Sequence, residues 1–121
     1  MVAVAKTSEP KPDLASNGRA IDVEHLARMT LGERSLEREV LALFDRQADM
    51  LLPRIRRGDP AVAAASAHTL KGSAVGIGAF GVARAAEAVE RAEDAAFAAA
   101  IETLAAVLEE TKAEIARLLA N

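Results

Sequence analysis

The chain has no cysteine, tryptophan or tyrosine, and three phenylalanines are its only aromatic residues. Without cysteine it can form neither disulfide bonds nor thiolate metal sites. A core with so few aromatic side chains must be built from Leu, Val, Ile and Ala, which favours packed helices over sheets. No apolar run approaches the roughly 18 residues that cross a membrane. The N-terminus also lacks the charged-then-apolar pattern of a signal peptide. We therefore expect a cytoplasmic protein.

The chain also has no excess of basic over acidic residues, since the formal net charge of its 121 residues is −3. Proteins that bind nucleic acids usually carry a basic face, often with stacking aromatic side chains, so this class is disfavoured. No glycine-rich loop follows a strand pattern, so the sequence predicts no nucleotide-binding site. The length suits one small domain with a single core.

The first 20 residues differ in composition from the rest of the chain. They contain proline, serine, asparagine and glycine without hydrophobic periodicity, which predicts a disordered tail over residues 1–20. Residues 21–121 show helical periodicity throughout, and we expect them to form one helical bundle domain.

Capping residues divide residues 21–121 into five predicted helices. Asp22 is a good N-cap for a short helix, and a second helix follows over about residues 33–57. Asp59 and Pro60 favour the start of a third helix, which ends near Gly78. A fourth helix is predicted over about residues 79–91, and a fifth begins near residue 94. The predicted apolar stripe of the second helix is Leu36, Val40, Leu43, Phe44, Leu51 and Ile55. The predicted heptad seam of the fifth helix is Phe97, Ile101, Leu104, Leu108, Ile115 and Leu118, interrupted by Thr111.

Short connections make consecutive helices antiparallel neighbours. We therefore expect an all-α protein, an antiparallel up-down four-helix bundle with an additional short N-terminal helix. Packing within such a bundle accounts for the heptad seam better than a coiled-coil dimer does. No exposed stripe would then remain to drive pairing, so we expect a monomer.

The third predicted helix carries His68, Lys71 and Gly72, whose spacing places them on one face. A neutral imidazole is a nucleophile, and a nearby lysine can neutralise an anion attached to it. Glycine inside a helix costs about 1 kcal/mol relative to alanine, so Gly72 requires a reason, and access to the ring is one. The pattern leaves two other readings open: a surface histidine on an alanine-rich helix, and a core histidine with a hidden partner. The small residues that share the His68 face are Ala61, Ala64, Ala65 and Val75. The opposite, core-forming face is predicted to consist of Ala63, Leu70, Ala74 and Ile77.

The run His68-Thr69-Leu70-Lys71-Gly72-Ser73-Ala74, followed by Ile77-Gly78-Ala79, resembles the signature of the histidine-containing phosphotransfer (HPt) domain family. The resemblance covers about residues 20–120 and implies the same four-helix bundle. It also implies that His68 accepts the phosphoryl group, that Lys71 stabilises its charge and that Gly72 keeps the ring accessible.

In some family members a glutamine and an arginine on the following helix also lie near the site. Extending the pattern without gaps places Glu90 and Asp94 at these positions, so that role is not transferred. A shift of one residue would instead bring Arg91 into consideration.

The resemblance further implies a free-standing phosphocarrier of a multistep phosphorelay, rather than a complete kinase. His68 would accept a phosphoryl group from a receiver-domain aspartate and pass it to another receiver, with a hybrid or other histidine kinase upstream. Ala61, Ala64, Ala65 and Val75 would form the docking surface. No intrinsic cofactor is expected, and Mg²⁺ would belong to the partner receiver domain.

Two alternatives remain from the sequence. One is an unphosphorylated HPt-like module that docks a receiver or a histidine kinase and regulates it. The other is a metal-binding bundle that uses His25 together with His68, although the Glu-x-x-His pattern of di-iron bundles is absent. We expect His25 to be a solvated surface residue.

Overall fold

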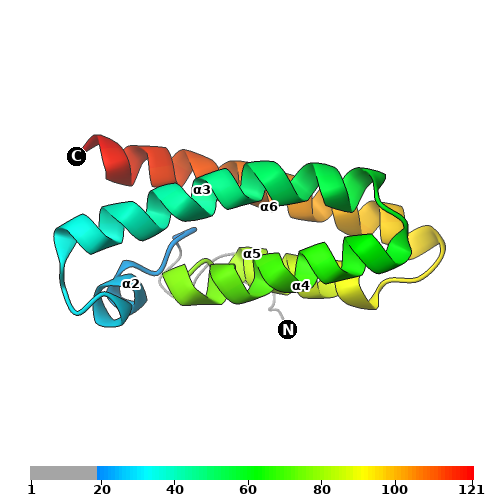
Figure 1. Cartoon of the computed structure of the whole chain (residues 1–121), viewed down its shortest axis with the longest axis horizontal. Helices are drawn as coiled ribbons and strands as arrows, with labels where there is room; N and C mark the ends of the chain where they lie inside the picture. Colours follow the sequence, from blue (N-terminus) through cyan, green and yellow to red (C-terminus); the bar gives the residue numbers. More distant parts are fainter. Residues whose placement is uncertain (1–18) are drawn as a thin grey trace, which may run out of the picture.

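The computed structural model describes residues 19–121, which form five α-helices and no strand (Figure 1). The all-α class expected from the sequence is thus confirmed. Residues 1–18 of the predicted tail lie outside the described residues. The helices are α2 (Val23–Met29), α3 (Arg34–Arg57), α4 (Pro60–Ile77), α5 (Phe80–Arg91) and α6 (Ala95–Ala120).

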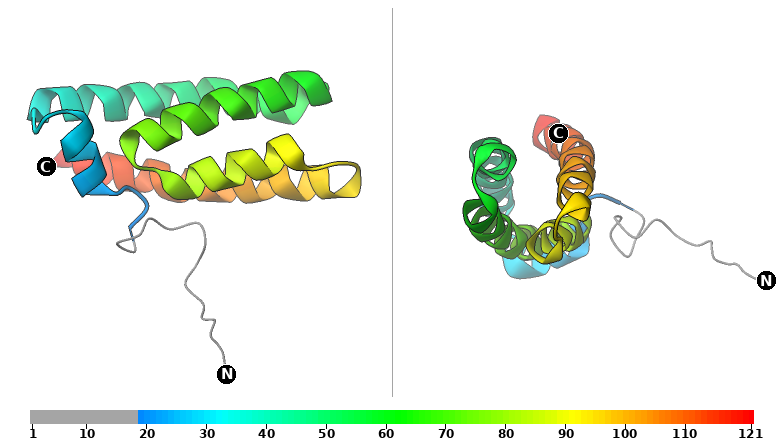
Figure 2. Two further views of the ribbon diagram at one scale, coloured as in Figure 1. Left: turned by 90° about the horizontal axis from the view of Figure 1, so that it is seen from below. Right: turned by 90° about the vertical axis from the view of Figure 1, so that its right-hand side faces the viewer.

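The four long helices follow one another in alternating directions around a common core (Figures 1 and 2). Each of them packs against the next along the chain, and α6 also packs against α3, which closes the bundle. The short helix α2 lies across one end and contacts α4. Within residues 19–121, none of the helices is both long and apolar enough to cross a membrane.

The ends of α2 and α4 are set by the capping residues that the sequence predicted. Asp22 accepts a hydrogen bond from the backbone N–H of His25 at 3.1 Å, and Asp59 accepts one from Val62 at 2.9 Å. These side chains satisfy donors that the first turn of a helix leaves without partners. Pro60 occupies the first helical position of α4, where its missing N–H costs nothing.

Gly78 ends α4 in a left-handed conformation, with φ of 82°. Its carbonyl oxygen accepts a hydrogen bond from the backbone N–H of Asp22 at 2.9 Å. A Cβ atom at this position would lie 2.7 Å from the carbonyl oxygen of Asp22. Both the backbone conformation and the close approach therefore require glycine. This contact fixes the start of α2 against the turn between α4 and α5.

Helices α4 and α6 bury the faces that periodicity predicted. The predicted core residues of α4 are all buried. In the α6 seam, four of the predicted positions are buried and Phe97 and Leu118 are partly buried. Thr111 is 2 % exposed, and its hydroxyl donates to the carbonyl of Val107 at 2.9 Å. This internal hydrogen bond explains how the seam tolerates a polar residue. The buried seam residues are Ile101, Leu104, Leu108 and Ile115.

The predicted stripe of α3 is wrong at two positions. Leu36 is 39 % exposed and Leu43 is 58 % exposed, whereas Leu41 and Ala48 are buried. The buried row alternates steps of three and four residues, and it faces α4 and α6 together. Leu36 and Leu43 belong to a second apolar row that points outward. The reason given for a monomer, that no exposed stripe remains, therefore fails.

His25 departs in part from the expectation of a solvated surface residue. The residue is partly buried, and its Nε2 makes an exposed contact of 3.0 Å with the carbonyl oxygen of Val75. The ring meets Phe80 edge-on, with the two centroids 5.1 Å apart. Since α2 folds back onto the turn between α4 and α5, His25 takes part in the packing at this end of the bundle.

Candidate functional site

His68 lies in the middle of α4, on the face turned away from the core. Its side chain is 68 % exposed. On the opposite face, Leu70 and Ala74 are fully buried, which fixes the rotation of α4 about its axis. The structure thus selects the exposed orientation from the alternatives that the sequence left open.

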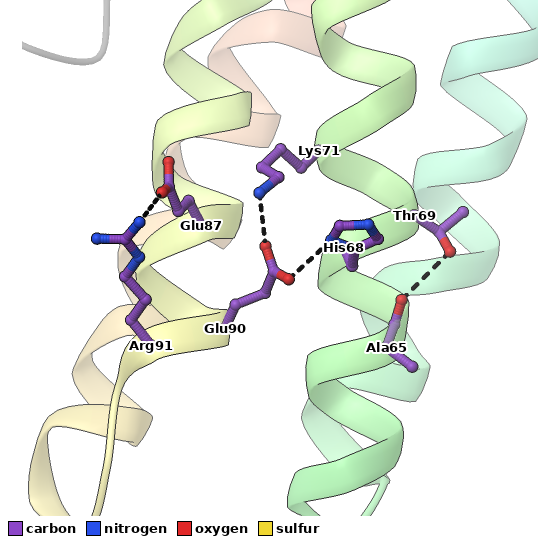
Figure 3. A network of polar contacts seen from close by, with 7 residues as sticks. All are labelled: Ala65, His68, Thr69, Lys71, Glu87, Glu90 and Arg91. Atoms are coloured by element: carbon purple, nitrogen blue, oxygen red, sulfur yellow. Dashed lines mark hydrogen bonds and ion pairs between the residues drawn. The ribbon is translucent and has the colours of Figure 1, made fainter.

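The imidazole of His68 has a partner on the neighbouring helix. Oε2 of Glu90, on α5, lies 2.8 Å from Nδ1 of His68 (Figure 3). The two residues are 22 positions apart in the chain, and the packing of α5 on α4 brings them together.

Lys71 contacts the same carboxylate. Its Nζ lies 3.1 Å from Oε1 of Glu90, and Figure 3 shows Glu90 between Lys71 and His68. The side chains of Lys71 and Glu90 are 29 % and 22 % exposed. Oε1 itself is buried, and Lys71 meets it as an ion pair rather than as a well-aligned hydrogen bond. The predicted pair of histidine and lysine is therefore a triad joined by Glu90.

The charge of Glu90 follows from its surroundings. Burial by itself would raise the pKa of Glu90, but the contacts with Lys71 and His68 outweigh it and hold that pKa below its usual value of 4.5. Glu90 is therefore ionised at neutral pH and can only accept hydrogen bonds.

This charge decides which nitrogen of the His68 ring is the donor in the contact with Glu90. Because the Glu90 carboxylate has no proton to donate, Nδ1 of His68 must be the donor in the 2.8 Å contact. In the neutral ring, Nε2 then carries the free lone pair. The arrangement presents a nucleophilic nitrogen on an exposed side chain while its other nitrogen is held in place.

Small residues share the exposed face of α4 with His68. A Cβ atom added to Gly72 would meet nothing within 4 Å, so the space beside this residue is open. Of the predicted docking positions, Ala61, Ala65 and Val75 are exposed and Ala64 is half-buried. The face is accessible, and its docking role stays a prediction.

Two open grooves lie beside members of the triad, one between α4 and α5 and the other where α4, α5 and the start of α6 meet. One contains Gly72, Val75 and Phe80 and reaches Lys71. The other contains Ala64 and Phe97 and reaches Glu90. The surface is therefore hollowed beside Lys71 and beside Glu90.

Arg91 does not take part in the site. It forms an ion pair with Glu87 at 2.6 Å, its side chain is 78 % exposed, and it points away from His68 (Figure 3). The residue that sequence reasoning missed is Glu90. Extending the HPt pattern without gaps had already placed Glu90 at the position of the family's glutamine. Glu90 was set aside because it carries a carboxylate where the family pattern has an amide.

The described residues offer no alternative metal centre. Within residues 19–121, no three side chains of His, Asp or Glu come together in a group that could hold a metal ion. His25 contacts Val75 and Phe80, so its ring has a packing role.

Comparison with known proteins adds to this geometry. The model of the Hpt domain matches residues 35–120, which include the whole triad. The chain belongs to the Hpt domain family. The fold of this Hpt domain is also similar to the crystal structure of the histidine phosphotransferase ShpA from Caulobacter crescentus. The two chains are 30 % identical with a TM-score of 0.66, over 81 % of this chain and 88 % of ShpA. No curated protein sequence matches the chain significantly.

Proposed function

We propose that this Hpt domain carries a phosphoryl group on Nε2 of His68, accepts it from a receiver-domain aspartate and passes it to a second receiver. Membership of the Hpt family supports the phosphorelay role. The observation that carries the proposal is the 2.8 Å contact between Glu90 and Nδ1, which leaves Nε2 as the nitrogen with the free lone pair in the neutral ring of an exposed side chain.

In the proposed transfer, one bond to phosphorus forms and one breaks. The Nε2 lone pair attacks the phosphorus of the aspartyl phosphate, and the bond from phosphorus to the aspartate oxygen breaks. The receiver aspartate leaves as a carboxylate, and a nitrogen–phosphorus bond forms. The ring keeps its proton on Nδ1 and becomes a cation, which the adjacent Glu90 carboxylate stabilises. Transfer to the next receiver is the reverse of these steps.

In this proposal, Lys71 gains a second partner when the phosphoryl group is transferred to His68. Before transfer, its ammonium is 3.1 Å from Glu90. Once a phosphoryl group sits one helical turn away on His68, the ammonium can also neutralise the phosphoryl oxygens. The Mg²⁺ that stabilises charge on the aspartate side would belong to the receiver, and a histidine kinase would supply the phosphate upstream.

The small-residue face of α4 would receive the partner. Ala61, Ala64, Ala65 and Val75 surround His68 without covering it, so an aspartyl phosphate can reach the ring. A transient contact of this kind suits the low end of interface sizes, below about 1,200 Å² of total buried area.

The test is a phosphotransfer assay with receiver domains from the same source. Each phosphorylated receiver is mixed with the wild-type chain and with His68→Gln, and labelled phosphate is followed. Wild type should take up phosphate that is acid-labile and base-stable, as expected of a nitrogen–phosphorus bond, and the variant should take up none. The stability of the variant should change by less than about 0.5 kcal/mol, because His68 is a surface residue.

Uptake by the Gln variant would show that another residue is the acceptor. Failure of both proteins to accept phosphate from every receiver, with binding retained, would support the alternative of an unphosphorylated docking module.

A further inference from the structure

An exposed apolar row runs along α3. Leu36, Leu43 and Met50 are 39 %, 58 % and 53 % exposed, and they follow one another at intervals of seven residues. Residues at this spacing lie nearly in line along a helix. Single exposed apolar residues are common on protein surfaces, whereas a row of them on one helix is a surface that a partner could cover.

Charged residues flank this row in an ordered way. The N-terminal half of the exposed face carries Glu33 and Glu39, and the C-terminal half carries Arg46 and Arg54. All four are exposed. Among residues 19–121, none of these four side chains has a hydrogen bond or ion pair with another residue. One end of the face is thus acidic and the other end basic, and neither is neutralised by another side chain of residues 19–121.

We propose that α3 pairs with α3 of a second copy of this chain, antiparallel, about a two-fold axis beside Leu43. Leu36 and Met50 lie seven residues on either side of Leu43. The two-fold axis therefore places Leu43 against its own copy and Leu36 against Met50, twice. A surface that is complementary to itself in this way is what a two-fold dimer requires.

The charged residues that flank the row are also complementary about this two-fold axis. Glu39 precedes Leu43 by four residues and Arg46 follows it by three, and both lie on the same side of the apolar row. In the antiparallel pair, Glu39 of each copy lies beside Arg46 of the other. Glu33 and Arg54, ten and eleven residues from Leu43, come to the same level. A parallel pair would instead place glutamate beside glutamate and arginine beside arginine, so the charges select the antiparallel arrangement.

Only three apolar side chains per copy form the centre of this contact, so the dimer is weak and reversible. The proposal rests on α3 alone and does not depend on the phosphotransfer function proposed for His68. The dimer and the phosphotransfer function can therefore be refuted independently of each other.

The test is sedimentation equilibrium of the full chain at concentrations from micromolar to millimolar. Wild type should show a reversible monomer–dimer equilibrium. Leu43→Glu should be monomeric, because it places two carboxylates at the axis, and its helical circular dichroism should match wild type because the side chain is exposed. Glu39→Arg should weaken the dimer, and Glu39→Arg combined with Arg46→Glu should restore it.

The matched control is Glu110→Arg, which makes the same change of charge at an exposed position of α6. It should leave the equilibrium unchanged. A wild-type chain that stays monomeric at millimolar concentration would overturn the proposal, as would a dimer that tolerates Leu43→Glu. A monomeric wild type combined with phosphotransfer weakened by Leu43→Glu would overturn it too, and would assign the row to a receiver contact.

Discussion

Glu90 on α5 accepts a hydrogen bond from Nδ1 of His68 on α4, at 2.8 Å and across 22 positions of the chain. The same carboxylate holds Lys71 at 3.1 Å. One acidic side chain thereby sets which ring nitrogen of His68 is free and where the nearest cation rests before transfer. Variants of Glu90 and Lys71 separate these two effects.

Replacing Glu90 tests the hydrogen bond and the charge independently. In Glu90→Gln, the amide oxygen can still accept from Nδ1 but the negative charge is gone, so the tautomer should be kept while phosphate acceptance falls below wild type. Glu90→Ala removes the acceptor, and the rate should fall by about tenfold or more, as for other residues that orient a functional histidine. Initial rates of acceptance and the nitrogen chemical shifts of His68, which report the tautomer, measure the two effects. Wild-type rate and tautomer in Glu90→Ala would contradict the assignment.

Lys71→Met should slow phosphate acceptance by about 100-fold, since it removes the cation nearest to the developing phosphoryl charge. It should also raise the pKa of Glu90, because Lys71 is the strongest of the contacts that lower it. An NMR titration of the Glu90 carboxyl carbon measures this change. Lys112→Met is the matched control, because Lys112 pairs with Asp45 and Asp49 on the α3–α6 side. If both lysine variants slow transfer equally, the effect is not specific to the site.

Gly72→Leu should fold and yet lose phosphate acceptance from receivers. A side chain at this position has open space, and leucine is a better helix former than glycine by about 0.5–1 kcal/mol. The new side chain would stand one turn from His68, where an aspartyl phosphate must approach. Gly76→Leu is the control, since its surroundings are equally open but it lies two turns from His68. Thermal unfolding and transfer rates check both variants. Normal transfer by Gly72→Leu would show that Gly72 does not control access to the His68 ring.

The stability of the bundle should depend on pH through Glu114. Its side chain is only 5 % exposed, and Arg19 and Arg117 contact it. Burial would raise the pKa of Glu114, but these two contacts outweigh it and hold the pKa below 4.5. A carboxyl with a lowered folded-state pKa stabilises the fold above its unfolded pKa, and this stabilisation disappears as the pH falls through the folded-state pKa. The contribution is therefore present at neutral pH and is lost below about pH 4.5.

Glu114→Gln tests this dependence. It should lower the free energy of unfolding by about 1 kcal/mol at neutral pH, a modest amount because both arginines are largely exposed. The difference from wild type should shrink at about pH 3. Urea unfolding at the two pH values provides the measurement, with the exposed Glu110→Gln as control. A difference that does not change with pH would show that Glu114 acts through packing alone.

Much of this protein is determined locally and could be predicted from the sequence. Asp59 with Pro60 and the glycine at position 78 fix where α4 begins and ends, because caps and breakers act on their immediate neighbours. The helical period alone placed His68 opposite the buried Leu70. The short spacing of His68, Lys71 and Gly72 indicated the site, and the family match confirmed the fold.

Tertiary structure decided the rest. Helical periodicity says which residues share a face, but not which of two apolar rows faces the core, so Leu36 and Leu43 were placed wrongly in α3. Likewise, nothing within α4 specifies what stands beside His68 on another helix. The register of α5 against α4, set by their core packing and by the turn at Gly78, brings the Glu90 carboxylate to Nδ1. A contact across 22 positions depends on that register, and only the folded bundle fixes it.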